Sequence, residues 1–124
     1  MARPDRQARQ AAEKGGRRAE TLAALYLRCK GYRVLARNVR TPAGEVDLVV
    51  RRGRTVVFVE VKQRTGRAEA GVAVARGQQQ RIARAAEYLS GTPRFSSLGD
   101  CFRIDLLLLR PGRWPEHLTD AWRS

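Results

Sequence analysis

The spacing of apolar residues along the chain changes from that of helices to that of strands and back. Between residues 16 and 30, apolar side chains recur every three or four positions, which predicts an amphipathic helix. The stripe consists of Ala19, Leu22, Ala23, Tyr26 and Cys29. Gly31 follows it, and a glycine is favoured just past the last helical residue. We expect the stripe, with Cys29, to face the core.

Runs of alternating or consecutive apolar residues predict four strands. The expected strands are residues 32–38, 45–51, 55–62 and 102–109. A second amphipathic helix is expected over residues 78–89, and a loop over residues 90–100. Residues 65–77 have no assignment, and residues 110–124 are expected to form a short irregular element. The resulting order, α-β-β-β-α-β, indicates an α/β fold.

The loop between two of these strands fixes how they pair. Gly53 suits the first central position of a two-residue type II′ turn, which would pair Arg52 with Thr55. In the register that follows, Asp47 lies directly opposite Glu60. Opposed side chains on one face have Cβ atoms about 4.5–5.5 Å apart. Two carboxylates held at that distance repel each other unless a positive charge lies between them.

The same register places Glu45 opposite Lys62 and Val49 opposite Phe58. Two interpretations of these charges remain open. One is a metal site for phosphodiester hydrolysis, in which a divalent cation binds the carboxylates and Lys62 orients or helps to deprotonate the attacking water. The other is a salt-bridge ladder from Glu45 to Lys62 on the solvent face of the hairpin.

Length and charge narrow the class of protein. The chain has 124 residues with 25 Lys and Arg against 12 Asp and Glu, a formal charge of +13. We expect a basic N-terminal arm of residues 1–15 and one domain of residues 16–124. No apolar run is long enough for a membrane helix, and two cysteines are too few for a disulfide framework. A cytoplasmic protein that contacts nucleic acid, with no membrane partner, is therefore expected.

Asp47, twelve intervening residues and then Glu60-Val61-Lys62 resemble the motif of the PD-(D/E)xK nuclease superfamily, whose core order is αβββαβ. More closely, the chain resembles the YraN family of small bacterial proteins. The matching pieces are residues 16–20, 31–35, 44–49, 57–64, 82–89 and 102–105, together with Asn38, Arg40, His117, Leu118, Ala121 and Trp122. The match covers roughly residues 15–122. It implies a single restriction-endonuclease-like core with a mixed sheet flanked by helices.

The resemblance also implies an activity and a set of site residues. It implies a nuclease dependent on Mg²⁺ or Mn²⁺, with Asp47, Glu60 and the carbonyl of Val61 as metal ligands and Lys62 as the catalytic lysine. Glu20 matches an acidic residue that many members place on the first helix, where it joins the site. Small junction resolvases belong to the same superfamily, so branched DNA is a plausible substrate. Cutting a junction needs two active sites, which makes a homodimer attractive.

Several other charged and aromatic residues have a candidate role. The arginines that could touch phosphates are Arg17, Arg18, Arg64, Arg81 and Arg84. Residues 78–80 are all Gln, where the family commonly has Lys or Arg, which weakens a DNA contact there. For Asp105, a structural pair with Arg103 is favoured over support of the site. His117 is expected to be structural, and Trp114 and Trp122 to pack rather than stack on bases.

Two other functions compete with the nuclease. One is a non-catalytic nucleic-acid-binding module that keeps the nuclease fold. The other is an interaction protein of a repair or ribosome-linked complex, in which the charge serves protein or RNA contacts. Two facing carboxylates beside phosphate favour the nuclease, because a module that only binds has no use for them.

Overall fold

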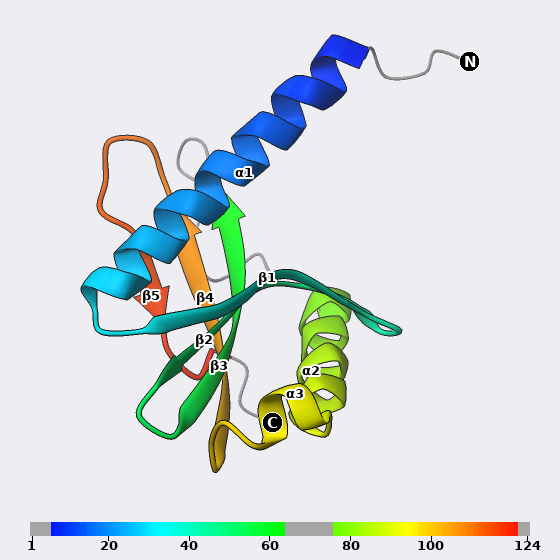
Figure 1. Ribbon diagram of the computed structural model, residues 1–124. Helices are drawn as coiled ribbons and strands as arrows, with labels where there is room; N and C mark the ends of the chain where they lie inside the picture. Colours follow the sequence, from blue (N-terminus) through cyan, green and yellow to red (C-terminus); the bar gives the residue numbers. More distant parts are fainter. Residues whose placement is uncertain (1–5, 64–75, 122–124) are drawn as a thin grey trace.

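The computed structural model describes residues 6–63 and 76–121 (Figure 1). In chain order the elements are α1 (Arg6–Cys29), β1 (Arg33–Thr41), β2 (Gly44–Arg52), β3 (Thr55–Gln63), α2 (Arg76–Ser90), α3 (Pro93–Ser96), β4 (Cys101–Leu109) and β5 (Glu116–Leu118). The predicted order α-β-β-β-α-β is confirmed. The structure adds the short helix α3 within the expected loop and the short strand β5 within the expected irregular tail.

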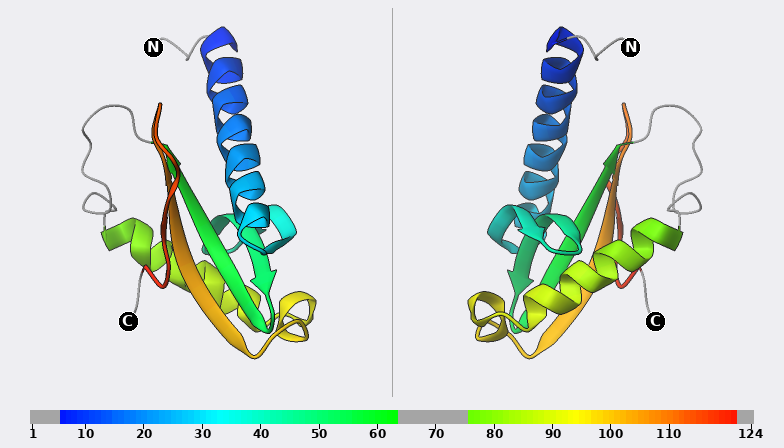
Figure 2. Two further views of the ribbon diagram at one scale, coloured as in Figure 1. Left: turned by 90° about the vertical axis from the view of Figure 1, so that its left-hand side faces the viewer. Right: turned by 90° about the vertical axis from the view of Figure 1, so that its right-hand side faces the viewer.

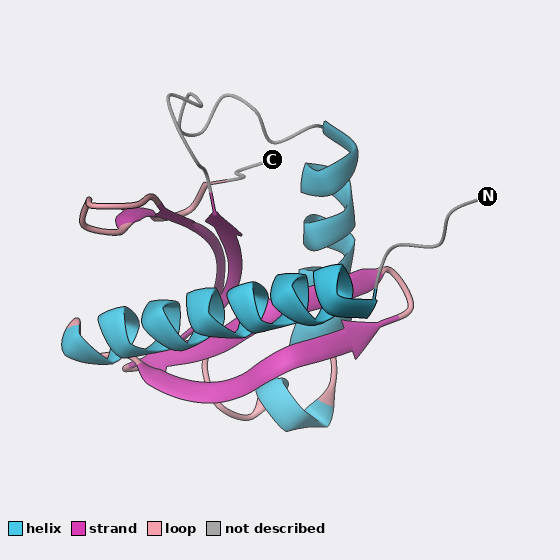
Figure 3. Ribbon diagram, turned by 90° about the horizontal axis from the view of Figure 1, so that it is seen from above, coloured by secondary structure: helices cyan, strands magenta, loops and turns pink. Residues whose placement is uncertain are grey.

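The five strands form one mixed sheet in the order β1-β2-β3-β4-β5. Strands β3 and β4 are parallel, and the other neighbouring pairs are antiparallel. Helix α1 lies along one face and α2 packs on the other, so that the sheet is sandwiched between them (Figures 2 and 3). This arrangement is consistent with the restriction-endonuclease-like core and confirms the expected mixed sheet flanked by helices.

Strand β3 lies at the centre of the sheet and is apolar on both faces. Val57 and Val59 belong to the cluster under α1, whereas Val56 and Phe58 belong to the cluster under α2. All four side chains are fully buried. A strand covered by helices on both faces needs such a continuous apolar run, which explains why the sequence is so rich in valine here.

The β2–β3 hairpin has the predicted register over its closed part. Arg52 pairs with Thr55 and Val49 with Phe58, and the ladder ends at Leu48 and Val59. Gly53 has a φ of 62°, the left-handed conformation that the first central position of a type II′ turn requires. The turn therefore determines which β3 residues follow β2 into the sheet.

The prediction for the first helix was wrong in its start and right for only part of its buried face: Ala19 and Ala23 are buried as expected, whereas Leu22 and Cys29 are not. Helix α1 begins at Arg6, ahead of the predicted start at residue 16. Its buried residues are Ala19, Ala23, Ala24 and Leu27. Leu22 is 58% exposed and Cys29 is also exposed, because the sheet packs against the alanine-rich side, which permits close approach. The helix therefore has two apolar faces, and the sheet covers only one.

Two further observations concern the surface. Trp114, which we expected to pack, is 89% exposed, while Trp122 lies outside the described residues. Within residues 6–63 and 76–121, none of the helices has both the length and the apolar character needed to span a membrane.

Candidate active site

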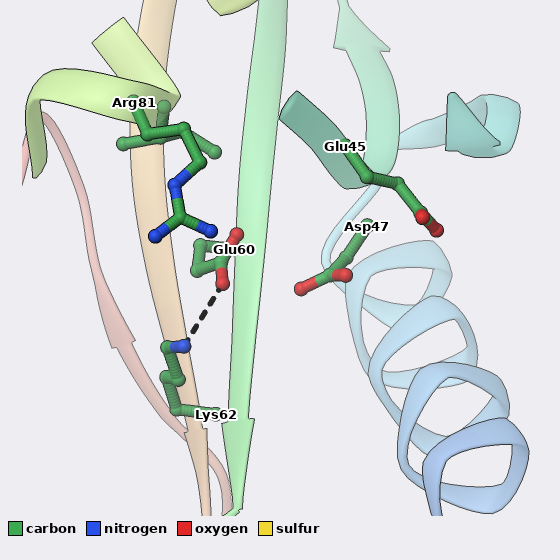
Figure 4. A pocket seen from close by; sticks show the side chains of 6 residues that line it. Glu45, Asp47, Glu60, Lys62 and Arg81 are labelled. Atoms are coloured by element: carbon green, nitrogen blue, oxygen red, sulfur yellow. Dashed lines mark ion pairs between the residues drawn. The ribbon is translucent and has the colours of Figure 1, made fainter. Parts of the chain in front are cut away.

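A cavity of about 270 Å³ lies beside the ends of β2 and β3, under the start of α2 (Figure 4). Its lining residues are Glu45, Asp47, Glu60, Lys62, Arg81 and Ile82. The cavity is at the point where the β2–β3 ladder has ended, so the two strands no longer hydrogen-bond to each other in register. Fold and cavity together bring Asp47, Glu60 and Lys62 to one site, as the sequence predicted.

The hydrogen-bonded β2–β3 ladder does not extend to the predicted pairs of Asp47 with Glu60 and of Glu45 with Lys62. Pairing stops one residue short of Asp47, and the side chain of Asp47 takes the place of the ladder. Its Oδ2 accepts a hydrogen bond of 2.8 Å from the backbone N–H of Val61. A side-chain acceptor that captures a strand N–H satisfies that donor and holds the two strands apart.

The carbonyl of Val61 faces the same gap as its N–H. In a strand, the N–H and C=O of one residue point to the same neighbouring strand. The N–H of Val61 points to Asp47 on β2, and the regular β2–β3 pairing ends two residues before it. The carbonyl oxygen is therefore directed toward the side of the carboxylates, where the resemblance places a metal ligand.

The position of Asp47 disfavours a negative charge on its side chain. The pKa of Asp47 is raised from 3.8 to about 7, first by burial and then by the charge of Glu60. Glu20 adds to the rise, whereas the Val61 N–H and the charge of Lys62 oppose it. The charge of Lys62 and the Val61 N–H therefore do not offset the effect of burial and of the neighbouring glutamates on Asp47.

Glu60 and Lys62 project from the same face of β3 and form an ion pair (Figure 4). The Lys62 Nζ lies 3.1 Å from Oε1 of Glu60, and the two side chains are 17% and 19% exposed. The predicted ladder from Glu45 to Lys62 is thus replaced by a pair within one strand. Residues 57–59, which precede the pair, are fully buried and fix the position of its backbone.

Glu20 lies near the site but does not line the cavity. Its Oε2 accepts a hydrogen bond of 2.9 Å from Nδ2 of Asn38, and Nη2 of Arg37 lies 3.9 Å away. Asn38 has a φ of 51°, a left-handed conformation that asparagine tolerates better than most residues. Because the charge of Glu20 raises the pKa of Asp47, the two carboxylates belong to one electrostatic environment.

Arg81 supplies the second positive charge in the cavity. Its side chain extends from α2 toward Glu60 and Lys62 (Figure 4), and no ion-pair partner for it is found in the described parts of the chain. Gly44, at the start of β2, makes room for its stem. A Cβ atom at Gly44 would lie 2.7 Å from Cδ and 2.8 Å from Cγ of Arg81.

The sequence did not predict this packing of Gly44 against Arg81. The one available signal was the glycine immediately before Glu45. Of the other arginines expected to touch phosphates, Arg18 and Arg84 are exposed on the two helices. The side chains of Arg17 and Arg64 lie outside the described residues.

The donor set is that of a sparse, oxygen-rich site. No group of three or more His, Cys, Asp or Glu side chains that could hold a metal is found within the described residues. Glu45 also lines the cavity, but its carboxylate points away from Asp47 and Glu60 (Figure 4), so these two carboxylates and the Val61 carbonyl are the candidate donors. Mg²⁺ commonly takes only one or two carboxylates, with water and phosphate oxygens as the other ligands. The residues present therefore fit a hard divalent cation that would take its remaining ligands from water and from a substrate.

A second polar cluster is structural. Asp105 is fully buried and accepts hydrogen bonds of 2.8 Å from both Nε and Nη2 of Arg103, which confirms the predicted pair. It also accepts from Nε2 of His117 at 2.7 Å and from the backbone N–H of Asp120 at 2.9 Å. Burial alone would raise the pKa of Asp105, but these donors outweigh it and lower the pKa. The cluster ties β4 to β5 and to the segment that follows.

The fold is consistent with the restriction-endonuclease-like class of α/β proteins. The chain belongs to the uncharacterised protein family UPF0102, whose model matches residues 19–109, which confirms the YraN-like resemblance. A UPF0102 protein of Parvibaculum lavamentivorans is 55% identical over 91% of this chain and 84% of its own length. UPF0102 proteins of Erythrobacter litoralis and Sphingopyxis alaskensis are 47% and 50% identical, each over 93% of this chain and 97% of their own length.

Proposed function

We propose that this protein is a metal-dependent nuclease that hydrolyses DNA phosphodiesters at the cavity beside β2 and β3. The observation that carries the proposal is the convergence of Asp47 and Glu60 on a cavity that also holds Lys62 and Arg81. Carboxylates bind a divalent cation, and ammonium and guanidinium groups bind phosphate. The combination of both kinds of group in one cavity matches the needs of phosphodiester hydrolysis.

Asp47 and Glu60 would hold the cation, with the Val61 carbonyl as a further oxygen donor. When bound there, Mg²⁺ or Mn²⁺ would lower the pKa of water and offset negative charge on the phosphate. The raised pKa of Asp47 supports this assignment, because a bound cation would remove the repulsion that raises it.

Lys62 and Arg81 act on the substrate in this scheme. Lys62, held against Glu60, orients the attacking water and donates a hydrogen bond to the phosphate as negative charge develops. Arg81 donates to a non-bridging phosphate oxygen and keeps the phosphate at the cavity. Water adds one P–O bond and one ester P–O bond breaks, which leaves a phosphate monoester and a hydroxyl group.

The charge of the chain supports a nucleic-acid substrate. The formal charge of +13 attracts a polyanion whatever its sequence. Exposed Arg18 and Arg84 extend the basic surface over the two helices that flank the sheet. Branched DNA remains a prediction within this proposal, as does a homodimer that would supply the two sites for cutting both strands of a junction.

Cleavage of labelled single-stranded, duplex, flap and four-way-junction DNA in Mg²⁺, Mn²⁺ or EDTA tests the proposal. We expect metal-dependent cleavage by the wild type and its loss in Asp47→Asn and Glu60→Gln. Lys62→Met should lower the rate at saturating substrate by roughly a hundredfold or more. Glu87→Gln, which removes an exposed carboxylate from α2, is the matched control and should cleave normally.

DNA binding, measured in parallel, separates the nuclease from the non-catalytic module. Glu60→Gln should bind DNA as tightly as the wild type or more tightly, because a negative charge beside the phosphate is gone. Binding by the wild type without cleavage of any substrate, in either metal, would reject the nuclease and favour the module.

A further inference from the structure

The side of α1 that the sheet does not cover carries a second apolar stripe. Leu22, Leu25, Tyr26 and Cys29 follow the i, i+3, i+4, i+7 spacing that places side chains along one face of a helix. Leu22 is 58% exposed and Leu25 is 50% exposed. Such spacing on an exposed helix face is typical of the anchors through which helices bind partners.

This stripe forms one wall of a groove of about 440 Å³. The opposite wall is the β4–β5 connection, which contributes Trp114 and Pro115. Trp114 is 89% exposed, although exposed tryptophan is uncommon away from binding surfaces. A concave apolar surface of this kind fits an inserted side chain or helix better than it fits a flat lipid surface.

The charges of the groove are all of one sign. The charged residues that line it are Lys30, Arg110 and Arg113, and no acidic side chain of the described residues does so. Arg110 is paired with Glu116, whereas Arg113 has no ion-pair partner in the parts of the chain that the structure describes. A second copy of this chain would bring a like-charged rim, and a net charge of +13, against this one.

We propose that this groove binds an acidic amphipathic segment of a partner protein. Large apolar side chains of the segment would lie against Leu22, Leu25 and Trp114, and its carboxylates would pair with Lys30 and Arg113. Apolar contacts would supply most of the affinity, and the basic rim would select an acidic partner. The groove would then recruit the protein without occupying the cavity at Asp47 and Glu60.

Trp114 is a built-in reporter for the test. In a Trp122→Phe background it is the remaining tryptophan of the chain. The probe is a synthetic helical peptide with leucines at i, i+3, i+4 and i+7 and glutamates at the other positions. One control peptide replaces the leucines by serines and keeps the charge, and another replaces the glutamates by lysines and keeps the leucines.

We expect a saturable blue shift of Trp114 emission with the acidic amphipathic peptide and roughly tenfold weaker binding of the serine peptide. Leu25→Asp should weaken binding by a similar factor while circular dichroism and DNA cleavage stay unchanged. Arg113→Glu should lower the affinity for the acidic peptide and raise that for the lysine peptide, which a loss of folding would not do.

Several results would overturn the proposal. Equal binding of the serine peptide would reduce the effect to bulk charge, and equal binding by Leu25→Asp would place the peptide elsewhere. A dimer that forms with rising protein concentration and is lost in Leu25→Asp would show that a second copy of the chain occupies the groove. Binding to anionic lipid vesicles that depends on Leu25, without binding of the acidic peptide, would show that the groove contacts a membrane.

Discussion

Replacing Asp47 by Asn should stabilise the metal-free protein at neutral pH while abolishing its activity. The carboxylate at this position is buried beside Glu60, and the pKa of Asp47 is raised from 3.8 to about 7 by that burial and by the charge of Glu60. Asparagine has nearly the same shape and can still accept the hydrogen bond from the Val61 N–H, which is 2.8 Å long in the wild type. The substitution therefore removes charge and leaves the backbone contact in place.

The size of the effect follows from proton linkage. Between pH 3.8 and about 7, the folded protein binds a proton at Asp47 that the unfolded chain has already lost. The free energy of unfolding therefore falls as the pH rises through this window. Each pKa unit corresponds to about 1.4 kcal/mol, so the full cost of ionising Asp47 in the folded state is at most about 4 kcal/mol.

Urea unfolding in EDTA, followed by circular dichroism from about pH 4 to about pH 8, measures this cost. The wild type and Asp47→Asn should have similar stability near pH 4, and the variant should become more stable by up to about 4 kcal/mol above pH 7. Glu87→Gln also removes one negative charge, but from an exposed position, so its stability should depend on pH as that of the wild type does. Parallel stability profiles for the wild type and Asp47→Asn, or a less stable variant at pH 8, would refute the reasoning.

Divalent cation should reduce the stability advantage of Asp47→Asn at high pH. Mg²⁺ or Mn²⁺ that binds the folded state raises its stability by mass action, provided that both carboxylates are present. Adding either metal at about pH 8 should therefore raise the melting temperature of the wild type and leave that of Asp47→Asn unchanged. Equal stabilisation of both proteins would place the bound metal elsewhere.

Three further outcomes are expected. Asp105→Asn should lower the free energy of unfolding by about 3–5 kcal/mol in urea titrations, since it breaks a buried charged cluster, whereas Asp100→Asn, which breaks the exposed ion pair of Asp100 with Arg54, should have little effect. Because the pKa of Asp105 is lowered on folding, wild-type stability should fall as the pH drops below 3.8, more steeply than in Asp105→Asn, in acid titrations followed by circular dichroism. Gly44→Ala should slow cleavage and destabilise the protein by about 1–3 kcal/mol in urea titrations, and part of that cost should vanish in an Arg81→Ala background, because the new Cβ would collide with the Arg81 side chain.

The cost expected for Asp105 rests on how completely its partners are buried with it. The His117 side chain is 2% exposed and its Nδ1 lies 2.6 Å from Nζ of Lys30, which donates to it. Nη2 of Arg103 also donates to the Tyr32 hydroxyl at 2.7 Å. Loss of the Asp105 carboxylate would leave Arg103 of β4, His117 of β5 and the backbone N–H of Asp120 without their common acceptor.

Much of the site could be predicted from the sequence because its determinants are local. A two-residue turn at Gly53 fixes the β2–β3 register, and the two-residue period of a strand places Glu60 and Lys62 on one face. The valines of β3 predict a strand that is buried on both faces. Short-range geometry of this kind needs no knowledge of the rest of the fold.

Other features depended on contacts between distant parts of the chain. The approach of Gly44 to Arg81 joins a hairpin to a helix more than thirty positions away in the sequence. Within the hairpin itself, the Val61 N–H donates to the Asp47 side chain at the point where the β2–β3 ladder has ended. The pattern of apolar positions does not show whether a side chain or a neighbouring strand will accept the hydrogen bond of a backbone N–H.

The face that α1 buries was likewise decided by tertiary structure. The periodicity put Ala19, Ala23, Leu22 and Cys29 in one stripe, but in the folded protein the two alanines are buried and Leu22 and Cys29 are exposed. The sheet packs against the alanines, whose small side chains allow the helix to come close. By itself the sequence determined the elements, the hairpin register and the residues able to form the site. Packing between elements decided which surfaces were buried and which were left for a partner, because that choice depends on shapes that meet only in the folded molecule.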